Sequence, residues 1–200
     1  MNDYIYLASQ SPRRSQLLDQ MGVRHELLLA DAREDAEGLE VLLKGESPSA
    51  YVQRVTALKL DAAVQRLQRR ALPDGVVLCA DTTVAMGRTI SGKPEHAQDA
   101  QRMLGELSGR THRVLTAVAA QHGTRRCAAL SVSHVRFAPM SASEIHDYVA
   151  SGEPFGKAGA YAVQGRAAQY IAHISGSYSG IMGLPMFETA QLLRTLGFSC

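Results

Sequence analysis

Tryptophan is absent from this 200-residue sequence, and cysteine is scarce. The three cysteines, Cys79, Cys127 and Cys200, stand far apart and form no CxxC pair or Cys/His cluster, which argues against a disulfide framework and against a zinc site. No apolar run approaches the length of a membrane span, and the first residues, MNDYIYLAS, lack the pattern of a secretory signal. We therefore expect a protein of the reducing cytoplasm that does not act at a membrane.

A strong charge of either sign is also missing. The sequence has 21 basic and 19 acidic residues spread along the chain, a net charge of +2, so a basic stripe for nucleic acid is not expected. The HExxH, GxSxG, Walker A and GxGxxG motifs are absent as well, which removes the commonest hydrolase and nucleotide-binding patterns. Any recognition of phosphate should therefore be local and should use arginines, lysines and a carboxylate.

What is present is an ordinary globular composition, 46% hydrophobic and 20% charged, in a length that fits one domain or two closely fused lobes. Apolar periodicity predicts strands over 4–8, 25–29, 76–80, 111–121, 127–137 and 169–174, and helices over 13–21, from Pro48 to before Pro73, 95–107, 141–150 and from Pro185. Strands mixed with helices, together with late hairpins, indicate an α/β fold whose mixed, twisted β-sheet is flanked by helices.

The segment LASQSPRRSQLL joins the first strand to the first helix. Ser11 suits the N-cap and Pro12 the first helical position, so Arg13 and Arg14 fall in the first turn, beside unpaired N–H groups. Positive charge at that end of a helix is locally unfavourable, unless a bound anion such as a polyphosphate uses the side chains and the amides together. A solvated basic patch is an equally good interpretation of these residues alone.

Five further residues carry candidate chemistry. Asp81 ends an apolar strand, where ligands bind in open α/β sheets, although a turn or capping role also fits. Lys59, Lys93 and Lys157 lie among small or stiff neighbours, although each lysine alone is more often a solvated charge. Glu34, in an acidic stretch, is a candidate ligand for a divalent ion, with an exposed acidic loop as the alternative.

Together, LASQSPRRSQLL, Ala80–Thr83, Gly92–Pro94 and Lys157–Tyr161 resemble the Maf-type nucleoside triphosphate pyrophosphatases, and the resemblance runs from about Tyr4 to Leu196. It implies one Maf-type α/β domain over residues 1–200, with a fold related to the inosine triphosphate pyrophosphatases. It also implies a cytoplasmic protein, frequent homodimers, and hydrolysis of a nucleotide to its monophosphate and pyrophosphate with a divalent cation, Mg²⁺ or Mn²⁺.

The resemblance also implies roles for the candidate residues. Asp81 corresponds to the proposed general base. The opening phosphate motif corresponds to Ser9, Arg13 and Arg14, further basic binding positions to Lys59, Lys93 and Lys157, and the metal-binding acids to Glu34 and Asp81.

Three positions separate the branches of this family by substrate. Arg13, Thr82 and Gln164 resemble the branch that acts on dTTP and UTP, whereas a second branch, acting on 7-methyl-GTP, has tryptophan, glutamine and glutamate there. The neutral amide of Gln164 suits the mixed donor and acceptor edge of a pyrimidine. We expect a dTTP and UTP pyrophosphatase. Modified pyrimidine nucleotides that present the same edge pattern are further candidate substrates. A 7-methyl-GTP pyrophosphatase and a nucleotide-binding regulator of cell division with little catalysis are the alternatives.

Overall fold

A computed structural model describes residues 3–31, 34 and 38–198 of the chain. Its helices and strands, in chain order, are β1 (Ile5–Leu7), α1 (Pro12–Gln20), β2 (His25–Leu27), a 3-10 turn η1 (Gly38–Glu40), α2 (Pro48–Arg69), β3 (Val77–Met86), β4 (Thr89–Ser91), α3 (Ala97–Leu107), β5 (Thr111–His122), β6 (Arg125–Phe137), α4 (Ala142–Ala150), the 3-10 turns η2 (Ala158–Ala160) and η3 (Arg166–Tyr170), β7 (Ile171–Ser175), α5 (Tyr178–Met182) and α6 (Met186–Thr195).

The strands form one seven-stranded sheet in the order β2-β1-β3-β5-β6-β7, and β4 pairs with β3 beside that path. β1 pairs in parallel with β2 and β3, whereas β3, β5, β6 and β7 pair antiparallel with one another. The mixed α/β sheet expected from the sequence is therefore confirmed, including the hairpin of β5 and β6.

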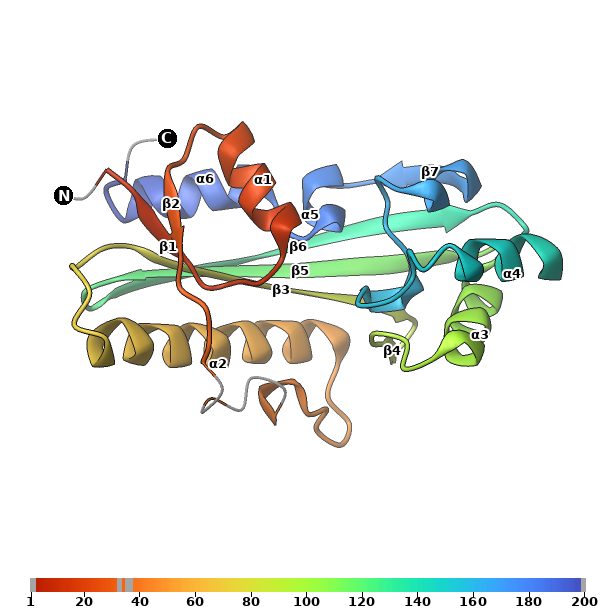
Figure 1. Ribbon diagram of the computed structural model, residues 1–200, viewed down its shortest axis with the longest axis horizontal. Coiled ribbons are helices and arrows are strands. Elements are labelled where there is room, and N and C mark those ends of the chain that lie inside the picture. Colours follow the sequence, from red (N-terminus) through yellow and green to blue (C-terminus); the bar gives the residue numbers. More distant parts are fainter. Residues whose placement is uncertain (1–2, 32–33, 35–37, 199–200) are drawn as a thin grey trace.

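Helices cover both faces of this sheet (Figure 1). The long α2 packs along one face against β3 and β5, and α1, α5 and α6 lie on the opposite face. Leu60 and Ala63 of α2 are fully buried against that first face, as Leu193 of α6 is against the second. No helix in the described ranges is long and apolar enough to cross a membrane.

One side of β3 is only partly covered by other strands. β1 pairs with β3 as far as Leu78, and β4 begins to pair at Val84, so residues 79–83 have β5 as their only strand neighbour in the described parts of the chain. The amide of Ala8 donates to the carbonyl of Leu78 over 2.9 Å, which places the main-chain groups of Leu78 on the β1 side. Because strand groups alternate, those of Ala80 and Thr82 face the same open side. We call this interval the β3 gap.

Capping explains where several helices begin. Ser47 accepts a hydrogen bond from the amide of Ala50 and starts α2, and Ser141 and Glu144 form a capping box at the start of α4. Ser11 does occupy the N-cap of α1, but its side chain makes no capping bond, and its amide donates to the Oγ of Ser9.

Other differences from the sequence prediction concern element length. β3 continues from the predicted strand through Met86 as one strand, and the five-residue α5 was not anticipated. Between β2 and α2 the described residues form one short helical turn, η1, and residues 32–33 and 35–37 lie outside the described residues, as does Cys200.

Candidate active site

A cavity of about 760 Å³ opens at the β3 gap, between the loop after β1, helix α2, the loop at 156–164 and the end of α5. The structure brings all ten site residues predicted from the sequence into its lining: Ser9, Arg13, Arg14, Glu34, Lys59, Asp81, Thr82, Lys93, Lys157 and Gln164. Residues spread over most of the sequence thus surround one space.

Arg14 is held on two sides at the start of α1. Its Nε donates to the carbonyl of Gly183 over 2.8 Å, and its Nη1 donates to the Oγ of Ser9 over 3.1 Å. Burial lowers the pKa of Arg14, and the charge of Asp81 opposes that shift. Arginine stays protonated in proteins, so a fixed positive charge faces the cavity at the positive end of α1. This corner of the cavity is suited to an anion.

The turn at the end of α5 supplies the acceptors that position both arginines. Arg13 Nε lies 3.4 Å from the carbonyl of Met182, and Gly183, at φ +119°, offers its carbonyl to Arg14. Ser177 caps α5 by accepting from the amide of Gly180 over 2.9 Å. The only local signal for this short helix, which the sequence prediction missed, is a serine three residues before a glycine that is followed by Ile181 and Met182.

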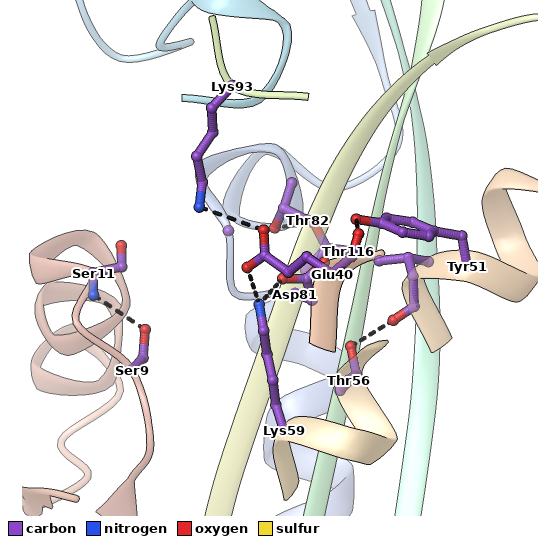
Figure 2. A network of polar contacts seen from close by, with 12 residues as sticks. Ser9, Ser11, Glu40, Tyr51, Thr56, Lys59, Asp81, Thr82, Lys93 and Thr116 are labelled. Carbon is purple, nitrogen blue, oxygen red and sulfur yellow. Dashed lines mark hydrogen bonds and ion pairs between the residues drawn. The ribbon is translucent and has the colours of Figure 1, made fainter. Parts of the chain in front are cut away.

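Lys59 of α2 stands at the centre of a charged cluster (Figure 2). Its Nζ lies 2.5 Å from Oδ1 of Asp81 and 2.7 Å from Oε1 of Glu40, and Lys93 Nζ lies 3.6 Å from the other oxygen of Glu40. The Tyr51 hydroxyl donates to the main-chain carbonyl of Glu40 over 3.0 Å, which ties η1 to α2. Two carboxylates and two ammonium groups therefore share one wall of the cavity.

Opposing effects act on Glu40. Burial raises the pKa of its carboxyl. The hydrogen bond and charge of Lys59, with a contribution from Lys93, lower that pKa by more than burial raises it, so the net shift is downward. Glu40 is therefore held as a carboxylate. It lies beside Asp81, which is only 8% exposed. Glu40 was not among the site residues predicted from the sequence, because nothing in its local sequence distinguishes it from the other acidic residues of this segment.

Glu34 lies in the same cavity lining but outside the Lys59 cluster. Both of its oxygens accept hydrogen bonds from Arg66, at 2.5 to 3.1 Å, and Arg69 donates to one of them over 2.8 Å. The bonds from Arg66 lower the pKa of Glu34 to about 2. Arg66 also donates to the carbonyl of Leu28, so Glu34 joins the segment after β2 to α2.

The loop that carries Lys157 and Gln164 forms the opposite wall. Lys157 Nζ donates to the carbonyls of Glu153 and Phe155 in its own loop, and burial lowers its pKa, with the charge of Arg13 acting in the same direction. The amide of Gly159 donates to the carbonyl of Gly92 over 2.9 Å, which connects this loop to the corner that presents Lys93. The positions of Lys93 and Lys157 are therefore linked through the main chain of the two loops.

Thr82 follows Asp81 on β3, so the two side chains point to opposite faces of the sheet. Asp81 faces α2, whereas the Oγ1 of Thr82 lies 2.9 Å from the Oγ1 of Thr116 on β5. Thr116 is 1% exposed and donates to the carbonyl of Gly180 in α5 over 2.7 Å. Thr116 was not among the site residues predicted from the sequence, since only the β3–β5 register reveals that it lies beside Thr82.

The fold and the site together define an α/β protein with a polyanion cavity built around a buried carboxylate. The chain matches the family model described as Maf-like protein over residues 4–196, and it belongs to that family. It is 68% identical over 198 residues to a dTTP/UTP pyrophosphatase of Albidiferax ferrireducens, covering 99% of both chains. It is also 66% identical to the dTTP/UTP pyrophosphatase of a Polaromonas species, covering 98% of this chain and 96% of that protein.

A likeness to a solved structure is weaker. The structure of the Staphylococcus aureus Ham1 protein matches 68% of this chain and 72% of its own, with a TM-score of 0.41 and 12% sequence identity.

Proposed function

We propose that this chain hydrolyses dTTP and UTP to the corresponding monophosphate and pyrophosphate. The observation that carries the proposal is the position of Asp81, held by Lys59 at the edge of a cavity whose lining also includes Arg13, Arg14 and Lys157. The names of the two relatives, which match nearly the whole chain, support the same reaction. In this proposal Asp81 lies where the attacking water would bind, and Arg13, Arg14 and Lys157 lie where the phosphates would bind.

In the proposed mechanism Asp81 orients a water molecule and accepts its proton as the water oxygen attacks the α-phosphorus. A bond forms between that oxygen and phosphorus, the bond to the oxygen bridging the α- and β-phosphates breaks, and pyrophosphate leaves with the electron pair. Arg14, already fixed by Gly183 and Ser9, neutralises charge that grows on the phosphate oxygens without first having to reorganise. Lys59 keeps the Asp81 carboxylate in place.

We also propose a divalent cation, Mg²⁺ or Mn²⁺, held by Asp81 and Glu40. The two carboxylates contact one ammonium group, so their oxygens are near enough to share a cation, and oxygen ligands suit both metals. No group of three or more His, Cys, Asp or Glu side chains in the described ranges is arranged to hold a metal, so phosphate and water would complete the coordination. When bound, such an ion supplies charge neutralisation and a more acidic water.

Glu34 remains the ligand predicted from the sequence. Both of its oxygens are held by arginines, and it shares no ion-pair partner with Asp81, whereas Glu40 shares Lys59 with it, which is why we favour Glu40. The cytoplasmic location and the homodimer likewise remain predictions from the sequence.

The test is pyrophosphate release from dTTP, UTP, CTP, GTP and 7-methyl-GTP with Mg²⁺ or Mn²⁺. We expect selective turnover of dTTP and UTP, a loss of roughly 100-fold or more in Asp81→Asn, and no loss in Asp147→Asn, a matched change at an exposed position. Turnover of 7-methyl-GTP alone would overturn the base preference. Tight nucleotide binding without hydrolysis under any metal condition would favour the regulatory alternative.

A further inference from the structure

The hydroxyl groups of Thr82 and Thr116 form a chain whose direction can be determined. A carbonyl oxygen only accepts, so the single hydroxyl proton of Thr116 is committed to Gly180, at 2.7 Å. With Thr116 donating to Gly180, Thr116 has no second proton, so we assign Thr82 as the donor in the 2.9 Å contact between the two threonines.

This direction determines what Thr82 can offer to the cavity. With its proton directed at Thr116, the Oγ1 of Thr82 has lone pairs left and therefore acts only as a hydrogen-bond acceptor. Thr82 lines the cavity and is partly exposed, whereas Thr116 behind it is buried. The free lone pairs therefore belong to the residue that a ligand can reach.

An acceptor at this place selects among the parts of a nucleotide. The ionised triphosphate has acceptor oxygens only, so it gains nothing from Thr82. The donors of a dTTP or UTP molecule are the N3–H of the base and the sugar hydroxyls. Cytosine has an unprotonated N3, so the same Thr82 oxygen would face another lone pair and leave both groups without a partner, which is costly in a buried site.

We propose that Thr116 is a specificity-determining positioning residue, which fixes the Thr82 hydroxyl as an acceptor for the N3–H of uracil or thymine. The inference deepens the proposed function and rests on it. Thr116 acts through Thr82 and does not itself touch the base, so its loss should change the choice of base more than the rate on a good substrate.

The decisive variant is Thr116→Val, which keeps the shape of the side chain and removes the hydroxyl. The Gly180 carbonyl keeps its bond from the amide of Gly183, at 3.0 Å, so no buried acceptor is left unpaired. The Thr82 hydroxyl is then free to turn and donate to N3 of cytosine. We expect the ratio of kcat/KM for UTP over CTP to fall roughly tenfold or more. Thr116→Ser keeps the hydroxyl and should therefore have the wild-type ratio.

Two substrate comparisons with the wild-type protein need no variant. Uridine triphosphate methylated at N3 should lose at least roughly tenfold in kcat/KM against UTP, and 2′,3′-dideoxythymidine triphosphate should be close to dTTP. The opposite pattern would move the contact to the sugar hydroxyls and overturn the proposal. An equal fall for UTP and CTP in Thr116→Val would also overturn it, since that result describes a structural role only.

The same ratios can be measured as Kd values with α,β-imido analogues of UTP and CTP, which resist hydrolysis. If the wild-type protein binds these analogues but hydrolyses no triphosphate, the proposed activity fails while the base-selection inference is still decided by the Kd ratio. If it hydrolyses UTP and the ratio does not respond to Thr116→Val, only the inference fails.

Discussion

Lys59 and Asp81 face each other across the contact between α2 and β3, with 2.5 Å between Nζ and Oδ1. The pair joins the longest helix to the central strand at the β3 gap, so the position of the carboxylate depends on the helix packing. Because the ammonium group of Lys59 also binds Glu40, Lys59 sets the position of the two carboxylates relative to each other.

Lys59→Met should therefore separate orientation from fold. The methionine retains the apolar stem packing while the two carboxylates lose their shared partner and repel each other. We expect kcat with UTP to fall at least roughly tenfold, with a smaller change in KM. Lys44→Met, at an exposed position, is the control and should match the wild-type protein. A kcat near the wild-type value in Lys59→Met would show that Asp81 needs no such support.

Glu40→Gln and Glu34→Gln separate the two candidate metal ligands. If Glu40 holds the cation with Asp81, its amide variant should need roughly ten times more Mn²⁺ for half-maximal activity, because an amide oxygen is the weaker ligand. Glu34→Gln should leave that concentration unchanged. The reverse result would assign the metal to Glu34.

The ion pair of Glu34 with Arg66 should show in the pH dependence of stability. The pKa of Glu34 falls from 4.5 to about 2 in the folded protein because Arg66 donates to it. The folded value lies below the unfolded one, so the contribution is complete above pH 4.5 and is lost as the pH falls toward 2. We expect the Tm difference between wild type and Glu34→Gln to be largest near neutral pH and to shrink below pH 4.5.

Thermal unfolding measured over that pH range provides the check. Glu26→Gln, at an exposed position, is the comparison variant. A Tm difference that stays constant down to the lowest accessible pH would contradict the assignment.

Gly159 is required for the loop that presents Lys157. Its φ is +70°, and a Cβ there would meet both methyl groups of Val84 at 2.9 Å. Gly159→Ala should lower the free energy of unfolding by roughly 1–3 kcal/mol and weaken nucleotide binding.

Gly156 provides a matched control for that substitution, because its φ is +72° and nothing lies within 4 Å of a Cβ built on it. Gly156→Ala should cost only the backbone strain, so the excess for Gly159→Ala measures the contact with Val84. That excess should shrink in a Val84→Ala background, as determined by denaturant unfolding of the wild-type protein, the three single variants and the two double variants. Equal costs at both glycines would rule out the contact.

The repeating patterns of the sequence predicted most of the fold. Apolar periodicity located the long helix α2 and the β5–β6 hairpin, and the Ser141–Glu144 capping box located the start of α4. These features depend on interactions between residues that are close together along the chain, so their patterns can be recognised in a single sequence. α5 was missed because five residues are too few for a helical period to appear.

The site was predicted in part for a related reason. Asp81 and Lys157 stand in unusual local settings, a strand end and a glycine-rich loop, which can be recognised from the sequence. Glu40 and Thr116 do not stand in such settings. Glu40 is one acid among many until η1 packs beside Lys59, and Thr116 is an ordinary strand threonine until its register places it behind Thr82.

The β3 gap also bears on what can reach the site. An uncovered strand edge is normally a template on which another polypeptide adds itself as a strand. Here the uncovered interval is bounded by β1 at one end and β4 at the other, so an extended chain has no straight path along it. A small molecule can enter from the side. The same arrangement that exposes polar main-chain groups to a ligand thus shields them from intermolecular strand pairing.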